Sequence, residues 1–302
     1  TFTFEDGATM ADLTTLPHPD FESSIDGQGG IDTIDFAPYS AVVTVDLSTG
    51  QSNHVALNAV GRLVDLENIV GGSNDDILSG DAGDNAITGS AGNDQMTGGL
   101  GNDTFLFADR WGPNDIVFEA LNEGSDTFDF SAVTEAVSGT LTFTFSFDGT
   151  GSPIATVIDA NGNLVRHTGD LTATMGNVEN FVGSETADSF IFEDGSAIGG
   201  AIDGLAGSDT LDYSAYTTGR DVVLTGLGSV DGFAGTELSV VDGFIVTTAA
   251  PSLASFDNID VIVGSASNLD SFTGMDAEAT FTINAVLNDY TSINSLTFSQ
   301  LK

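Results

Sequence analysis

A strict nine-residue step over residues 71–106 constrains this chain more than any other feature of its sequence. Its four units read GGSNDDILS, GDAGDNAIT, GSAGNDQMT and GGLGNDTFL. The sixth position of each unit holds Asp76, Asn85, Asp94 and Asp103, and the eighth holds Leu78, Ile87, Met96 and Phe105. Each unit therefore predicts an acidic, glycine-rich turn followed by a short strand with one inward apolar side chain. Because such a unit cannot bury that side chain alone, successive units must stack coil upon coil.

The array resembles the RTX family, the haemolysin-type calcium-binding repeats with the pattern G-G-x-G-x-D-x-U-x. The resemblance implies a parallel β-roll in which two units make one coil and each Ca²⁺ lies between a turn and the equivalent turn one coil later. It pairs Asp76 with Asp94 at one ion and Asn85 with Asp103 at another. Asn85 departs from the pattern and removes one negative charge, so we expect the second site to be weaker or empty.

The chemistry of the turns suits calcium, which takes six to eight hard oxygen ligands. Without a cation, opposed carboxylates would repel each other. Tight turns can add backbone carbonyl oxygens to the carboxylates, and the residues expected to line the sites in this way are Gly71, Ser73, Gly80, Ala82, Gly89, Ala91 and Gly98. Ordinary Asx and glycine turns are the alternative interpretation, but turn chemistry alone does not require the nine-residue register.

Composition points to the same kind of partner. The chain of 302 residues carries 45 acidic residues against five Lys and Arg, a formal net charge of −40. Such a surface repels nucleic acids and anionic membrane faces and attracts divalent cations. No segment is long and apolar enough to predict membrane insertion. The sequence contains no Cys, so metal rather than disulfide bonds is expected to stabilise an exported protein.

Longer repeats predict an all-β, right-handed parallel β-helix or β-roll solenoid built from three degenerate modules. The blocks GGIDTIDFAPYS, EGSDTFDFSAVT and AGSDTLDYSAYT open the modules. Alternating apolar residues predict strands within them. Asn161-Gly162 predicts a hairpin, which we expect at about 154–167 as an arm that protrudes from the solenoid. The expected divisions are an N-terminal cap at 1–22, module one at 23–112, module two at 113–200 and module three at 201–302.

Acidic turns outside the array are candidates as well. Residues 27–35 and 204–212 fit the nonapeptide frame with Asp32 and Asp209 at the sixth position, and we expect calcium at both. Asp126, Asp188 and Asp270 lie in less regular turns, where a solvated turn carboxylate is an equally good interpretation.

The sequence offers little for catalysis. His18, His54 and His167 are scattered, and no nucleophile elbow, zinc-protease motif or phosphate-binding loop occurs. We therefore expect an extracellular, calcium-dependent structural protein of a cell surface, adhesin, filament or surface layer, and no enzyme. Surface glycans are further possible partners. The alternatives are a carrier domain of a secreted toxin or hydrolase, and a polysaccharide-modifying β-helix enzyme.

Both ends of the chain contain alternating, strand-like runs, at residues 1–4 and 295–301. At the ends of a solenoid such strands would present open edges, which proteins normally cover or use for pairing. We expect these two runs to join neighbouring copies into a filament or lattice by strand addition, or else to cap the coil.

Overall fold

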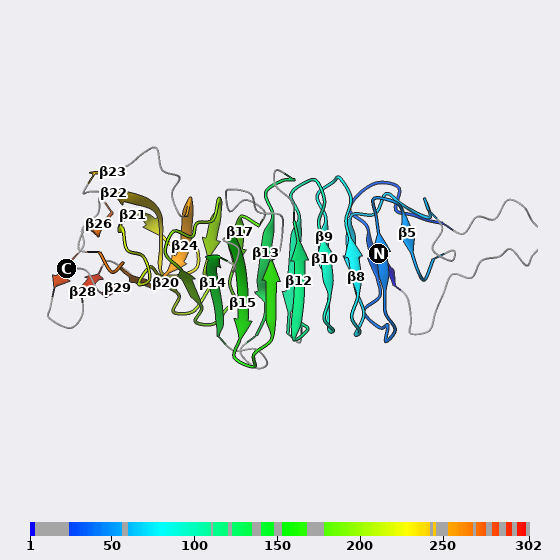
Figure 1. Cartoon of the computed structure of the whole chain (residues 1–302), viewed down its shortest axis with the longest axis horizontal. Helices are drawn as coiled ribbons and strands as arrows, with labels where there is room; N and C mark the ends of the chain where they lie inside the picture. The colour runs from blue at the N-terminus through cyan, green and yellow to red at the C-terminus, as the bar shows by residue number, and fades with distance from the viewer. Residues whose placement is uncertain are drawn as a thin grey trace, which may run out of the picture.

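The computed structural model of this chain describes residues 1–3, 24–55, 60–109, 111–119, 123–134, 140–147, 153–167, 178–241, 244–245, 253–267, 270–275, 280–283, 288–291 and 295–299. The molecule is elongated, and its strands are stacked along the long axis from the N-terminal to the C-terminal end (Figure 1). The elements in the described residues are all β-strands, and this part of the chain contains no helix that could cross a lipid bilayer. The expectation of an all-β solenoid with parallel sheets is confirmed.

Two large sheets make up the solenoid, and we name them sheet 1 and sheet 2. Sheet 1 follows the order β1 (Phe2–Thr3), β3 (Thr33–Asp35), β7 (Asn68–Val70), β9 (Ala86–Thr88), β11 (Thr104–Ala108), β13 (Thr127–Ala132), β17 (Asn180–Val182), β19 (Ala201–Asp203), β24 (Ser255–Ile259), β22 (Phe233–Val241), β21 (Gly219–Leu227) and β26 (Ser271–Thr273), with β23 (Phe244–Ile245) beside β22.

Sheet 2 follows the order β27 (Thr280–Ile283), β28 (Asn288–Thr291), β29 (Ser295–Ser299), β25 (Val261–Val263), β20 (Thr210–Asp212), β18 (Ser189–Phe192), β14 (Leu141–Phe147), β15 (Pro153–Asp159), β16 (Leu164–His167), β12 (Asn114–Phe118), β10 (Gln95–Thr97), β8 (Ile77–Ser79), β4 (Thr44–Asp46) and β5 (Gln51–Ser52). The short strands β2 (Ile25–Asp26) and β6 (Leu63–Val64) form a separate pair.

The nine-residue step determines this arrangement, because each unit contributes one short strand and consecutive strands alternate between the sheets. Strand β8 pairs in parallel with β10, and β7 pairs in parallel with β9. This register places Leu78 beside Met96 and Ile69 beside Ile87. All four side chains are buried, so the eighth position of the unit forms the core between the two sheets.

The same stacking continues past the array, where larger aromatic side chains fill the core. Phe105, Phe128 and Phe181 occupy equivalent positions on successive sheet 1 strands. Their rings meet edge to face at 5.9 Å and 5.5 Å between centroids. On sheet 2, Phe143 and Phe190 stack at 4.4 Å. The phenylalanines therefore extend the solenoid where the nonapeptide pattern has ended.

The predicted hairpin forms, but its expected place outside the solenoid is wrong. The Gly162 amide donates to the Asp159 carbonyl at 3.0 Å and closes the turn. Strand β15 then pairs with β14, and β16 pairs in parallel with β12, so both strands lie inside sheet 2. The physical reason is burial: Val157 and Val165 face the core and are fully covered, which a protruding arm would not allow.

The ends of the sheets also differ from expectation. Strand β1 is the outermost described strand of sheet 1 and pairs in parallel with β3. Strand β29, however, lies between β25 and β28, so residues 295–299 are covered on both sides and do not form an open edge. Most of the expected N-terminal cap at 1–22 lies outside the described residues. The division into three modules stays a prediction. The segments DTIDF and DTFDF of the first two opening blocks lie in sheet 1, at β3 and β13, whereas the segment DTLDY of the third lies in sheet 2, at β20.

Candidate calcium-binding edges

Two rows of acidic side chains follow the turns that lead into the strands. The row before sheet 1 strands, here the sheet 1 row, contains Asp32, Glu67, Asn85, Asp103, Asp126 and Glu179. The row before sheet 2 strands, here the sheet 2 row, contains Asp76, Asp94 and Asp115 and, further along, Asp188, Asp209 and Asp260. In almost every case the residue directly precedes the first residue of its strand; Asp115 is the second residue of β12.

Within each row, a carboxylate accepts a hydrogen bond from the backbone of the equivalent residue one coil earlier. In the sheet 2 row, the Asp76 amide donates to Asp94 Oδ1 at 2.8 Å and the Asp94 amide donates to Asp115 Oδ1 at 2.9 Å. In the sheet 1 row, the Asn85 amide donates to Asp103 Oδ1 at 2.7 Å, and the Asp103 amide donates to Asp126 Oδ1 at 2.8 Å. Asp76 to Asp115 and Asn85 to Asp126 thus form hydrogen-bonded ladders along the two edges of the roll.

The arrangement brings together the residues that the sequence pairs. Asp76 and Asp94 are neighbours on one edge, 18 residues apart in the chain. Asn85 and Asp103 are neighbours on the other edge at the same spacing. Asn85 also uses its amide group, because Nδ2 donates to the Glu67 carbonyl at 2.8 Å. Asn85 thus has an amide donor where the other units have a second carboxylate oxygen, and the weaker site expected there stays a prediction.

The opening glycines allow the carboxylates to fold back onto their own turns. A Cβ at Gly71 would lie 2.6 Å from Asp76 Oδ2, and one at Gly98 would lie 2.7 Å from the Asp103 Cβ. Gly80 and Gly89 meet Asn85 and Asp94 in the same way. The approach is closer than any side chain permits, so glycine at the first position and a short acidic residue at the sixth form one structural pair.

The remaining array residues hold the turns in register. The Ser73 amide donates to the Tyr39 carbonyl at 2.9 Å, and the Ala91 amide donates to the Gly72 carbonyl at 3.3 Å. Ala82 lies in the turn between β8 and β9. These contacts fix the turn backbones on the edges where the sequence analysis expects calcium, and the carbonyl ligation by these residues stays a prediction.

The electrostatics of the rows favour a cation. Burial raises the pKa of Asp94 to about 8, and the nearby Asp115 and Asp76 carboxylates add to the rise. Burial likewise raises the pKa of Asp103 to about 6 and that of Asp115 to about 7. Within the described residues, Asp94 Oδ2 and Asp103 Oδ2 are buried without a hydrogen-bond partner. A bound cation would satisfy these oxygens and offset the mutual repulsion, so the residues present fit Ca²⁺.

Sequence reasoning misses several carboxylates in and beside the rows. Glu119 is one: it lies near the sheet 1 row, its Oε1 accepts the Gly98 amide, and carboxylate oxygens of Asp103, Glu119 and Asp126 lie within 4.8 Å of one another. Burial raises the pKa of Glu119 to about 9. Asp115, Glu67, Glu179 and Asp260 are also missed. Glu67 and Glu179 do carry a signal, because each begins a similar Glu-Asn-apolar-Val-Gly block.

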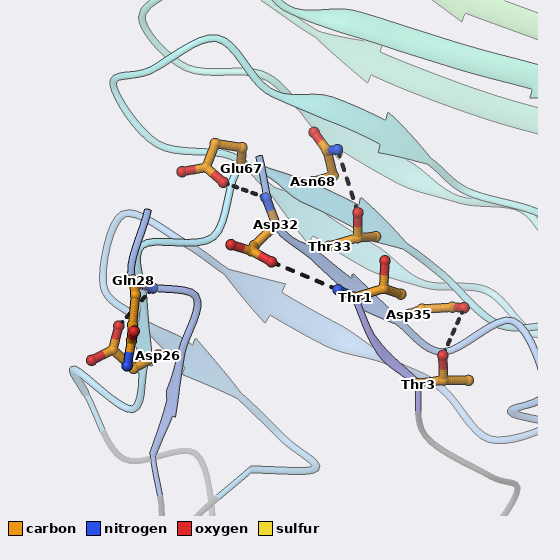
Figure 2. A network of polar contacts seen from close by, with 9 residues as sticks. All are labelled: Thr1, Thr3, Asp26, Gln28, Asp32, Thr33, Asp35, Glu67 and Asn68. Atoms are coloured by element: carbon orange, nitrogen blue, oxygen red, sulfur yellow. Dashed lines mark hydrogen bonds and ion pairs between the residues drawn. The ribbon is translucent and has the colours of Figure 1, made fainter. Parts of the chain in front are cut away.

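The more distant candidates separate into different groups. Asp126, Asp188 and Asp209 belong to the rows. Asp270 directly precedes β26 of sheet 1, but its Oδ1 accepts the amide of Arg220, which is not a row residue, at 2.9 Å. Asp32 belongs to the sheet 1 row, and its amide donates to Glu67 Oε2 at 2.7 Å. Its carboxylate lies 3.6 Å from the backbone nitrogen of Thr1, as Figure 2 shows, and calcium at Asp32 stays a prediction.

Comparison with known proteins supports the interpretation of the array. Curated proteins give no match to this chain. A family model does match at residues 70–105, over four copies, and the repeats of that family bind Ca²⁺. Residues 70–105 are therefore RTX calcium-binding nonapeptide repeats, and calcium is the cofactor of the β-roll that they build.

Proposed function

We propose that this chain is a secreted structural solenoid that folds when it binds calcium outside the cell and serves as a building unit of a cell surface, adhesin or filament. The observation that carries the proposal is the pair of rows of buried and half-buried carboxylates within and beyond an RTX array. Asp76 with Asp94, and Asp103 with Asn85 and Asp126, would hold the ions. Bound calcium supplies positive charge where the fold brings carboxylates together.

Folding and export are linked through this charge. A chain with a formal net charge of −40 must bring carboxylates together along both edges in order to stack its coils. In a calcium-poor cytoplasm that step is opposed by repulsion and by the desolvation of each carboxylate. At millimolar calcium outside the cell, binding to the folded state alone contributes directly to the free energy of folding.

The assembly part of the proposal is supported by the sheet ends. Strand β1 in sheet 1 and β5 in sheet 2 are the outermost described strands at one end of the solenoid. Strands β26 and β27 are outermost at the other end. Outer strands present unpaired backbone groups that can pair with another copy. Because β29 is covered, we propose β26 and β27 in its place as the C-terminal side of a head-to-tail contact.

A structural rather than catalytic role is supported by the environment of His54. Its ring lies 4.4 Å from the Tyr39 ring and 5.7 Å from the Phe36 ring, measured between centroids. Its Nε2 lies 3.1 Å from the Val42 carbonyl oxygen. These contacts use the imidazole to pack the first coils, and a side chain held this way is poorly placed to transfer protons to a substrate.

Circular dichroism and light scattering of the full chain test the proposal. In millimolar calcium we expect a strong β signal and particles larger than the monomer, and in excess chelator we expect loss of both. Magnesium at the same concentration should not restore the β signal, because it requires a smaller and more rigid site. A full β signal in chelator at neutral pH would contradict calcium-dependent folding. Light scattering that shows only monomers in calcium would contradict the proposed assembly but not the proposed calcium-dependent folding.

A further inference from the structure

A second cluster of carboxylates lies far from the nonapeptide array, where sheet 2 row residues meet the β21–β22 hairpin. Carboxylate oxygens of Asp209, Asp231 and Asp260 lie within 4.8 Å of one another. Asp209 and Asp260 precede β20 and β25 on adjacent coils. Asp231 comes from the loop between β21 and β22. The cluster therefore combines two turns of the solenoid with a loop that has no counterpart in a nonapeptide.

Each of the three carboxylates has one oxygen committed to the backbone. Asp209 Oδ1 accepts the Asp188 amide at 2.7 Å, and Asp260 Oδ2 accepts the Asp209 amide at 3.2 Å. Asp231 Oδ2 accepts the Gly207 amide at 3.2 Å. These bonds orient the side chains without neutralising their charge.

Two further carboxylate oxygens in the cluster accept no hydrogen bond from the described residues. The Asp209 side chain is fully buried, and within the described residues neither its Oδ2 nor Asp231 Oδ1 has a hydrogen-bond partner. Arg220 of β21 lies at the end of the hairpin away from this loop and pairs with Glu237. A buried carboxylate oxygen without a donor costs free energy, because it has lost water and gained no partner. A bound cation would remove that cost.

The loop is held over the turns by a dedicated residue. Asn258 is buried and adopts a left-handed backbone conformation, with φ of 56°. Its Oδ1 accepts the Val230 amide at 2.8 Å, and its Nδ2 donates to Asp203 Oδ1 at 2.6 Å. The Ser229 amide donates to Asp257 Oδ1 at 3.1 Å. Asp231 is thus brought to the edge of the solenoid by a specific set of bonds.

We infer that Asp209, Asp231 and Asp260 form a further calcium site, in which the hairpin loop closes over two coil turns and supplies the third carboxylate. All the candidate ligand atoms are carboxylate oxygens, which are hard ligands. Zinc prefers nitrogen and sulfur ligands, which these three side chains do not offer. Oxygens within 4.8 Å of one another can share one ion at the Ca²⁺–O distances of about 2.3–2.6 Å. The inference does not depend on self-assembly, but it shares with the proposed function the premise that calcium is the ion.

Charge repulsion in the absence of a cation supports the same assignment. Burial raises the pKa of Asp209 to about 8, and the Asp188, Asp260 and Asp231 carboxylates add to the rise. Burial also raises the pKa of Asp260, with a further contribution from Asp231. The three groups therefore oppose one another when they are ionised together.

Hydrogen-exchange mass spectrometry on the full chain, in calcium and in chelator, can localise this site. The wild-type protein should show calcium-dependent protection both in peptides from residues 71–106 and in peptides from residues 204–232. Asp231→Asn should lose the protection of 204–232 and keep that of 71–106. Glu193→Gln is the control, because it removes one exposed charge outside the cluster and outside both monitored segments, and it should keep both.

The outcomes separate this inference from the proposed function. Protection of 204–232 in Asp231→Asn equal to that of wild type would overturn the inference, as would a wild-type protein whose calcium protects 71–106 alone. Absence of calcium-dependent protection at 71–106 would instead count against the proposed function. If Asp231→Asn fails to fold in calcium, Asp260→Asn provides the same comparison, because its remaining side-chain oxygen can still accept the Asp209 amide.

Discussion

At the scale of single residues, the glycine that opens a nonapeptide and the acidic residue at its sixth position depend on each other. The carboxylate turns back over the glycine, donates nothing, and accepts the backbone amide of the coil before it. The side chain is therefore both a ligand candidate and a bridge between coils. Removing it would leave a backbone amide without its partner, which costs about 1–3 kcal/mol when the amide is buried.

Gly89→Ala tests this dependence within the array. The added Cβ would lie 2.9 Å from the Asp94 Cβ and closer still to Asp94 Oδ2. We expect a loss of about 1–3 kcal/mol in the free energy of unfolding, as for overpacked sites, together with weaker calcium binding. Gly83→Ala is the control, because its Cβ would meet only Asp81 Oδ1, at 3.4 Å. Urea unfolding at several calcium concentrations measures both effects, and equal behaviour of the two variants would contradict the expectation.

At the scale of elements, the β15–β16 hairpin shows how an insertion can be absorbed by the solenoid. Its two strands fill sheet 2 between β12 and β14, so the sheet remains continuous although the chain connection is antiparallel. Alternation along β15 is consistent with this position: Val157 is fully buried and the next residue, Ile158, is 41% exposed.

Val157→Ala and Ile158→Ala give a matched pair of core and surface changes on this strand. The first removes two buried methyl groups, at about 0.8 kcal/mol each plus a cavity contribution, and should cost about 2 kcal/mol. The second should change stability by about 0.5 kcal/mol or less. Urea unfolding in saturating calcium gives both values. Similar, small effects of the two substitutions would show that the hairpin does not pack into the sheet.

The hairpin also illustrates what the sequence could and could not predict. The Asn161-Gly162 turn and the alternating strands are local features, and both form where they were expected. The pairing of β15 with β14 and of β16 with β12 depends on distant strands, which no local pattern specifies. The same distinction holds along the edges. Asp94 is visible in a regular spacing of 18 residues, whereas Asp126 and Glu179, 53 residues apart, are neighbours only because the intervening chain leaves the row and returns.

At the scale of the whole molecule, calcium and protons are alternative ways to neutralise the same carboxylates. Burial raises the pKa of Asp76 to about 6 and that of Asp209 to about 8, from an ordinary value of 3.8. Because these pKa values are higher in the folded state than in the unfolded chain, the metal-free folded protein binds more protons over that range. The stability that these groups contribute is fully present below about pH 4 and is lost as the pH rises through 6 to 8.

We therefore expect the metal-free protein, which should lack its β signal in chelator at neutral pH and above, to regain a β signal and a melting transition at pH 5. The calcium-saturated protein should show a weaker or reversed dependence, because calcium binds the deprotonated ligands. Circular dichroism melting at both pH values measures the difference. Asp94→Asn provides the control, since Asn keeps an oxygen for the Asp76 amide but carries no charge at pH 8. In chelator it should keep more β signal than wild type at pH 8 and match wild type at pH 5, whereas a metal-free wild type that gains β signal with rising pH would show that carboxylate repulsion does not limit the fold.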